Sequence, residues 1–107
     1  MYKQKKIEKW AEEKGIYYGG GNFIAQMKGI AEEVVEATEA YTQADYSIGA
    51  APSIALESEL GDIYVFWINA CWIAGIDPKD AVNAAYEKIS KRTGSMKDGR
   101  FVKEGMW

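Results

Sequence analysis

Apolar residues recur at intervals of three and four along most of the chain, and this spacing places them on one face of a helix. The pattern predicts four helices, over residues 2–14, 22–43, 53–74 and 78–92. No stretch alternates apolar and polar residues as a β-strand does, so the residues after Gly94 predict an irregular, basic C-terminal tail. We therefore predict an all-α fold close to a four-helix bundle, formed by a single domain over residues 1–107.

Glycine, proline and capping residues indicate where these helices begin and end. Gly15 and Gly75 are placed to end the first and third helices. Asn22 is a suitable N-cap for the second helix. Asp77 and Pro78 supply an N-cap and a first helical residue for the fourth.

Charge is distributed unevenly along the 107 residues. The 50 residues from Gly29 to Pro78 contain nine acids and no Lys or Arg, whereas the rest of the chain holds 13 basic and 7 acidic residues. Carboxylates gathered without cations repel one another unless solvent or a bound cation neutralises them. The net charge of −3 provides no attraction to nucleic acid or to an anionic membrane, so we expect neither as a partner.

Two residue types narrow the chemistry further. The chain has no histidine, which excludes His-based acid–base catalysis, Ser–His and Cys–His dyads and His-containing metal sites. Its one cysteine, Cys71, lies in an apolar helix and is expected in the core. The apolar run over 63–75 is too short to span a membrane, and the polar residues 1–13 are unlike a signal peptide. We expect a cytoplasmic protein.

Acidic side chains flank the apolar face of the second helix. At 100° per residue, Glu33 and Glu36 lie together on one side of this face, three residues apart. Glu32 and Glu39 point further round, towards solvent. The apolar face itself is the predicted core stripe, which comprises Ile30, Val34, Ala37, Thr38 and Tyr41.

The third helix is apolar on nearly all sides, and it carries a second pair of acids, Glu59 and Asp62, within an apolar sector. A helix of this kind is central or is buried by a partner subunit. Two antiparallel helices, each with such a pair, bring four carboxylates together. All-oxygen ligation suits Mg²⁺ or Mn²⁺, and Mg²⁺ usually binds substrate phosphates as well. The pattern therefore predicts a metal site and a phosphate-bearing ligand.

Cationic and polar side chains elsewhere are candidates to bind that ligand. Lys88 and Arg92 lie four residues apart on the predicted fourth helix, and Lys103 follows in the tail, so these three are candidates to bind phosphate. Asn22, Gln26 and Asn83 are candidates to bind the rest of that ligand, although Asn22 and Gln26 also suit a cap and a solvent-facing position. Five aromatic residues are candidates to stack on a flat ring in it: Trp10, Tyr17, Tyr18, Phe23 and Trp107.

The two acidic segments resemble a known signature. Glu32-Glu33-Val34-Val35-Glu36 and Glu59-Leu60-Gly61-Asp62 are similar to the E-E-x-x-E and E-x-x-D motifs of MazG-like nucleotide pyrophosphohydrolases, in the all-α NTP pyrophosphatase superfamily. The resemblance implies Mg²⁺-dependent cleavage of a nucleoside triphosphate to monophosphate and pyrophosphate by a homodimer or homotetramer. It also implies that Glu33, Glu36, Glu59 and Asp62 are the metal ligands. Glu32 is the additional acid of the motif, and with Glu33 and Glu36 it is a candidate catalytic residue.

Two other interpretations are compatible with the same residues. The chain could be a non-catalytic helical module that dimerises through its third helix, with the acids merely exposed. It could also be a metal-dependent phosphoester hydrolase of another kind, which would release orthophosphate or mononucleotides. A substrate panel that is read for pyrophosphate separates the three.

Overall fold

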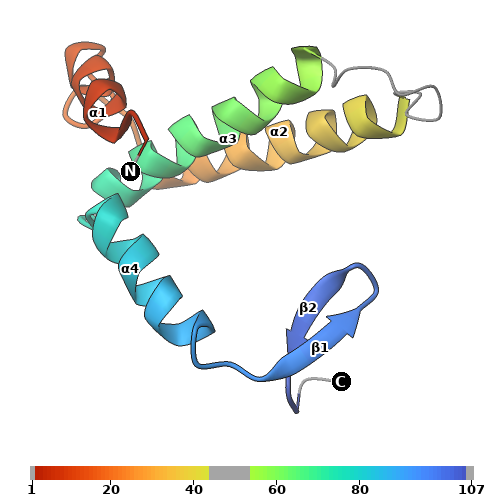
Figure 1. Ribbon diagram of the computed structural model, residues 1–107. Helices are drawn as coiled ribbons and strands as arrows, with labels where there is room; N and C mark the ends of the chain where they lie inside the picture. The colour runs from red at the N-terminus through yellow and green to blue at the C-terminus, as the bar shows by residue number, and fades with distance from the viewer. Residues whose placement is uncertain (1, 44–53, 106–107) are drawn as a thin grey trace. The chain divides into compact units, whose positions relative to one another are not determined.

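The computed structural model describes residues 2–43 and 54–105 (Figure 1). The chain forms two compact units, Met1–Ile76 and Asp77–Trp107. The first contains α1 (Gln4–Glu13), α2 (Phe23–Gln43) and α3 (Ile54–Ile73), and the second contains α4 (Pro78–Ile89), β1 (Gly94–Lys97) and β2 (Arg100–Lys103). The predominantly helical fold is confirmed, whereas the packing of all four helices into one bundle stays a prediction. Ser53, the predicted first residue of the third helix, and Trp107 lie outside the described residues.

The predicted capping residues act as caps. The Asn22 Oδ1 atom accepts a hydrogen bond from the Ala25 backbone N–H at 2.8 Å, and the Asp77 Oδ1 atom accepts one from the Lys79 N–H at 2.9 Å. Gly15 and Gly75 both have φ of 77°, a left-handed conformation that glycine adopts without strain. The signals for the end of α1, the start of α2, the end of α3 and the start of α4 were thus legible in the sequence.

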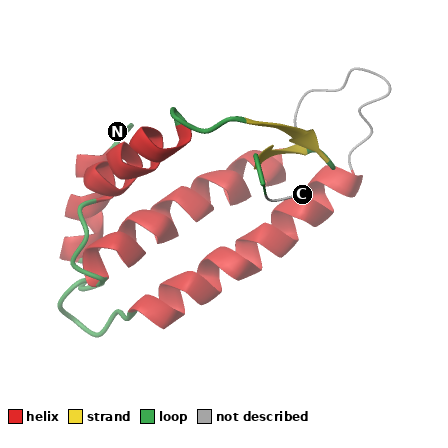
Figure 2. Ribbon diagram, turned by 90° about the horizontal axis from the view of Figure 1, so that it is seen from below, coloured by secondary structure: helices red, strands yellow, loops and turns green. Residues whose placement is uncertain are grey.

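In the first unit, α3 is the central helix, as its apolar surface predicts. The longer helix α2 lies alongside one side of it (Figures 1 and 2). Helix α1 contacts another side and crosses α3 steeply, so that α1 is seen nearly end-on in Figure 1. Ala11 and Ile68, from these two crossing helices, are both completely buried. Cys71 is also buried, which confirms its predicted place in the core.

The predicted apolar stripe of α2 is only partly buried. Ala37 is buried and Ile30 is half-buried, but Val34, Thr38 and Tyr41 are exposed. The prediction that this stripe lies in the core is therefore wrong for Val34, Thr38 and Tyr41 in the single chain. The physical reason is that, among the described elements of this unit, α2 packs on α3 alone, and one neighbour covers only part of a helix.

Helix α4 is shorter than predicted. It ends at Ile89, and the Arg92 N–H bonds to the Ile89 carbonyl oxygen at 3.1 Å in a turn beyond the helix. The Ser90 hydroxyl bonds back to the Glu87 carbonyl oxygen at 3.3 Å, as serine often does at helix ends. Lys88 is therefore in the last turn of α4 and Arg92 is outside it, so their expected helical spacing of four residues is wrong.

The tail is a β-hairpin and not an irregular segment, which corrects the prediction made from its composition. Strands β1 and β2 pair antiparallel (Figure 1). In this pairing Lys97 is opposite Arg100 and Met96 is opposite Phe101. The turn is Asp98-Gly99, whose φ angles are 50° and 83°. Two consecutive positive φ values fit the tight hairpin turn that Asp-Gly favours. Asp98-Gly99 is thus the sequence signal for the hairpin, although the flanking residues show little apolar–polar alternation.

Along the described residues, no helix is both long enough and apolar enough to cross a membrane.

Candidate functional site

The register between α2 and α3 fixes which acids face each other. The Asn69 Nδ2 atom donates to the Gln26 Oε1 atom at 3.4 Å, and three residues along each helix Gly29 packs against the Phe66 ring. The two helices are thus antiparallel, and residues of increasing number in α2 lie level with residues of decreasing number in α3. Four residues further on, Glu33 is level with Asp62. Three residues beyond that pair, Glu36 is level with Glu59. The four predicted ligands therefore occupy one stretch of the α2–α3 contact.

Glu33 is at the centre of this negative region. Burial raises the pKa of its carboxyl group above the ordinary value, and the charges of Glu36, Asp62, Glu59 and Glu32 raise it further. The acids whose charges raise the pKa of Glu33 come from both helices, so the four predicted ligands lie near one another. Keeping Glu33 ionised here is unfavourable, so a cation bound beside it would be favoured.

Two carboxylate oxygens in this region are buried and have no hydrogen-bond partner in the described chain. They are the Oε2 atoms of Glu33 and Glu59, one from each helix. A buried oxygen without a donor is costly unless a ligand satisfies it. None of the region's acids forms an ion pair with a described Lys or Arg, so the chain's own cations do not explain these oxygens.

The remaining acids are on the solvent side. Glu36 and Asp62 are exposed, as are Glu32 and Glu39, whose outward positions were predicted. Within residues 2–43 and 54–105, no three acidic or cysteine side chains are gathered tightly enough to hold a single ion as they stand. The donor set nevertheless fits a hard cation, because every donor is a carboxylate and the two exposed side chains can rotate towards the buried pair.

A polar network that sequence reasoning missed continues along the same contact. Asn69 is only 2% exposed, accepts a hydrogen bond from the Tyr17 hydroxyl at 3.2 Å and donates one to Gln26. The available signal was an asparagine inside the apolar run of α3, because such a residue is buried only with partners. Gln26 is half-buried and belongs to this network, so it does not simply face solvent, and its role in binding the nucleotide stays a prediction.

Asn22 forms a cap in the first unit, whereas Asn83 and the three candidate phosphate-binding residues lie in the second unit. Asn83 and Lys88 are exposed on α4, Arg92 is exposed after it, and Lys103 is exposed on β2. Their role in binding nucleotide or phosphate stays a prediction.

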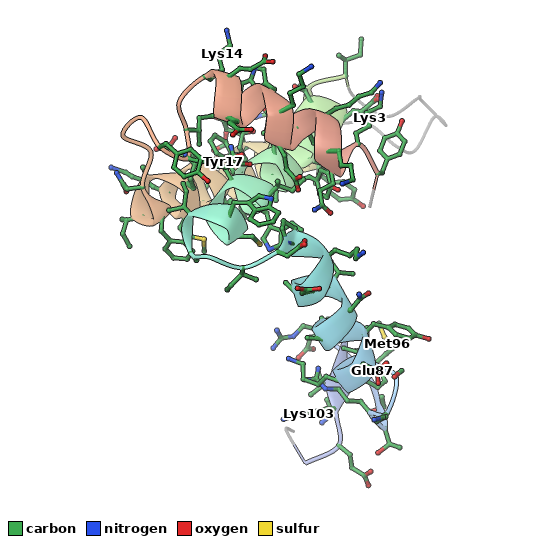
Figure 3. All side chains as sticks on the ribbon, turned by 90° about the vertical axis from the view of Figure 1, so that its left-hand side faces the viewer. Lys3, Lys14, Tyr17, Glu87, Met96 and Lys103 are labelled. Atoms are coloured by element: carbon green, nitrogen blue, oxygen red, sulfur yellow. The ribbon has the colours of Figure 1, made fainter. Side chains whose placement is uncertain are left out.

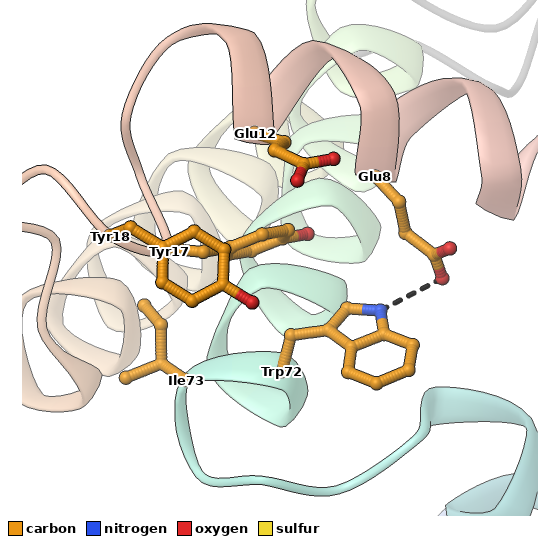
Figure 4. Close-up of a pocket in the computed structure, with 6 residues that line it drawn as sticks. All are labelled: Glu8, Glu12, Tyr17, Tyr18, Trp72 and Ile73. Atoms are coloured by element: carbon orange, nitrogen blue, oxygen red, sulfur yellow. Dashed lines mark hydrogen bonds between the residues drawn. The ribbon is translucent and has the colours of Figure 1, made fainter.

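Two cavities flank α1 in the first unit. Figure 4 shows the one of about 310 Å³, in which the Trp72 Nε1 atom donates to the Glu8 Oε2 atom at 2.8 Å. It is lined by Glu8, Glu12, Tyr17, Tyr18, Trp72 and Ile73. The other, of about 340 Å³, is lined by Lys3, Lys6, Ile7, Trp10, Asp62 and Val65. Only the second contains one of the predicted metal ligands.

A comparison with protein families agrees with the arrangement of acids. The family model described as MazG nucleotide pyrophosphohydrolase domain matches residues 22–96, well over half of the chain. The chain belongs to this family. Membership of the MazG family indicates a nucleotide pyrophosphohydrolase, a hydrolase that acts on a nucleotide. Comparisons with curated proteins and with solved structures gave no match.

The MazG match covers some candidate residues and leaves others out. It includes the four carboxylates of α2 and α3 and also Lys88 and Arg92. It begins at Asn22, so α1 and the cavity walls that α1 provides lie before the matched range. Lys103 lies after it.

Proposed function

We propose that the protein is a Mg²⁺-dependent nucleoside triphosphate pyrophosphohydrolase, which cleaves ribo- or deoxyribonucleoside triphosphates to the monophosphate and pyrophosphate. The observation that carries the proposal is the pair of buried, unpartnered oxygens of Glu33 and Glu59, within a negative region of α2 and α3. Membership of the MazG family supports the same reaction class.

Glu33, Glu36, Glu59 and Asp62 would hold the metal in this proposal. Mg²⁺ suits their oxygen donors, and Mn²⁺ is an acceptable substitute. When bound, the ion would neutralise part of the triphosphate charge and make an attacking water more acidic. The partly exposed position of Glu36 and Asp62 leaves room for substrate phosphates beside their carboxylates.

A carboxylate would accept the proton of the attacking water, since the chain has no histidine and carboxylates surround the proposed metal site. Glu32 is adjacent to Glu33 and exposed, and it is near enough to raise the pKa of Glu33. A carboxylate outside the ligand set is available to orient the water and accept its proton. We assign this role to Glu32, with Glu33 and Glu36 as the other candidate catalytic residues.

We also propose that the protein acts as a homodimer or homotetramer. Val34, Val35, Tyr41 and Leu60 are each 47–59% exposed on α2 and α3, where a solvent-facing helix would carry polar residues. A second copy would cover these side chains. Light scattering coupled to size-exclusion chromatography tests this, and a strictly monomeric protein at micromolar concentration would contradict it.

The reaction is tested with a panel of NTPs and dNTPs in Mg²⁺, read for pyrophosphate. Glu36→Gln and Asp62→Asn should lower kcat/KM by about 100-fold or more, since even indirect disturbance of metal ligands has effects of ten- to hundredfold. Glu39→Gln is the matched control on the outward side of α2 and should retain activity. Release of orthophosphate, or of mononucleotides from polymers, would favour another phosphoester hydrolase, and no product at all would favour a non-catalytic module.

A further inference from the structure

The cavity of about 340 Å³ between α1 and α3 adjoins the carboxylate region, because Asp62 belongs to both. Its side chains come from one flank of α1 and from one turn of α3. Lys3 and Lys6 are the cations among them, and Lys3 lies just before the first residue of α1 (Figure 3). The function proposed above assigns nothing to this cavity.

The crossing of α1 over α3 separates two flanks of α1 by charge. Lys3, Lys6 and Trp10 are spaced three and four residues apart and face the part of α3 that holds Asp62. Glu8 and Glu12, also four residues apart, face Trp72, ten residues further along α3. The cationic flank is thus directed to the carboxylates, and the anionic flank is directed away from them.

A triphosphate needs cationic groups near its phosphates in addition to any metal. The carboxylate region provides none, since α2 has no Lys or Arg after Lys28 and α3 has none at all. Lys3 and Lys6 are the described cations that share a cavity with Asp62. Both are exposed and neither forms an ion pair within the described residues. The Lys3 Nζ atom lies 5.6 Å from the centre of the Tyr2 ring, and an exposed contact of this kind is weak enough for the ammonium group to pair with an anion instead.

The rest of the cavity wall is apolar. Trp10 is 45% exposed, and Ile7 and Val65 are half-buried beside it. An indole ring that is partly open to solvent is a surface on which any nucleobase can stack. Among the described residues that line the cavity, the polar groups are the two ammonium groups, the Asp62 carboxylate and the indole N–H of Trp10. Few groups are therefore left to recognise one particular base edge by hydrogen bonds.

We infer that this cavity binds the nucleoside part of the substrate, with Trp10 stacked on the base and Lys3 and Lys6 paired with the phosphates. The inference rests on the proposed pyrophosphohydrolase function, because the substrate is a nucleoside triphosphate. Since stacking depends little on base identity, and apolar walls discriminate weakly, the enzyme accepts several bases. The expected kcat/KM values for the four common dNTPs differ by no more than about tenfold.

Binding is measured by calorimetry with the non-hydrolysable α,β-methylene analogue of dATP in Mg²⁺, on the full chain. The double variant Lys3→Met/Lys6→Met should raise the Kd about tenfold. Its matched control is Lys5→Met/Lys9→Met, which removes two exposed lysines of the same helix outside the cavity and should change the Kd by less than about twofold. Trp10→Leu should weaken all four dNTP analogues alike, and Trp10→Phe should restore most of the loss.

The outcomes separate this inference from the proposed function. Pyrophosphate release by the wild type, with equal Kd values in the two lysine variants, would overturn the cavity assignment and leave the enzyme function standing. Tight analogue binding that depends on Lys3 and Lys6, without pyrophosphate release, would support the cavity and contradict the reaction. Selectivity of a thousandfold for one base would also overturn it, because stacking alone cannot produce such a preference.

Discussion

Gly29 on α2 and Phe66 on α3 are so close that a single methyl group does not fit between them. A Cβ atom at Gly29 would lie 2.7 Å from the Phe66 Cε1 atom and 2.8 Å from its Cζ atom. This contact sets how near the two helices approach, one turn before the level of Glu33 and Asp62. The separation of the carboxylates across the two helices therefore depends on the absence of a side chain at Gly29.

Gly29→Ala should lower the free energy of unfolding by about 1–3 kcal/mol, because the Phe66 ring must shift within a packed contact. The higher helix propensity of alanine would by itself stabilise α2 by about 1 kcal/mol. A net loss of stability would therefore mean that the clash with Phe66 is the larger effect. Gly61→Ala is the control, since a Cβ atom there meets nothing within 4 Å, and it should stabilise α3. Urea denaturation measures both variants. Equal stability of the two would contradict the close contact, and Phe66→Leu should restore stability to Gly29→Ala.

Glu33→Gln should raise the melting temperature of the metal-free protein at neutral pH. The variant removes a charge that burial and the neighbouring acids disfavour, as the raised pKa of Glu33 shows. The same variant should lose most of the stabilisation by Mg²⁺, which for the wild type amounts to about 2.7 kcal/mol at a hundred times the Kd. Glu39→Gln should change neither quantity. If Glu33→Gln kept the full Mg²⁺-induced shift in differential scanning fluorimetry, Glu33 would not be a ligand.

The helices and the acid pairs were predictable because they depend on local spacing. Glu33 and Glu36, like Glu59 and Asp62, lie three residues apart, and this interval places two side chains on one face of any helix. What the spacing could not provide is the register, which depends on Gly29 meeting Phe66 in three dimensions. The spacing identified the carboxylates, and tertiary packing set them level with one another.

The failures of sequence reasoning have equally specific causes. The cavity walls from α1 could not be foreseen, because the crossing of α1 over α3 depends on the burial of Ala11 against the central helix. The exposure of Val34 and Tyr41 was missed because helical periodicity identifies an apolar face without saying whether the same chain covers it. The hairpin was missed because its strands are only four residues long, although Asp98-Gly99 was a usable signal.

Gly99→Val should disrupt the hairpin, because the φ of 83° at this position is unfavourable for a β-branched side chain. We expect a local loss of about 1–2 kcal/mol, confined to β1 and β2. Asp98→Asn is the matched control, since asparagine also tolerates the positive φ of 50° found there. Cross-strand NMR contacts between Met96 and Phe101 report the pairing. Their persistence in Gly99→Val would contradict the turn geometry.

Tyr17 should ionise only at strongly alkaline pH. Burial raises its pKa to about 12, and the negative charges of Glu8 and Glu12 contribute to the rise. Because the folded state retains the proton that the unfolded chain loses above its ordinary pKa of 10.0, stability should fall as pH rises between 10.0 and about 12. Phenolate absorbance, taken as the difference between the wild type and Tyr17→Phe, measures this titration.

The variant Glu8→Gln/Glu12→Gln tests how much of the Tyr17 shift is electrostatic. The two carboxylates line the same cavity as Tyr17, and removing their charge should lower its pKa. The pKa should nevertheless stay above 10.0, since burial is the larger cause and is unchanged. Glu13→Gln, on the same helix outside the cavity, should leave the titration where it was. A fall to the ordinary value in the double variant would mean that charge outweighs burial, and no change would mean that the anionic flank of α1 does not face Tyr17.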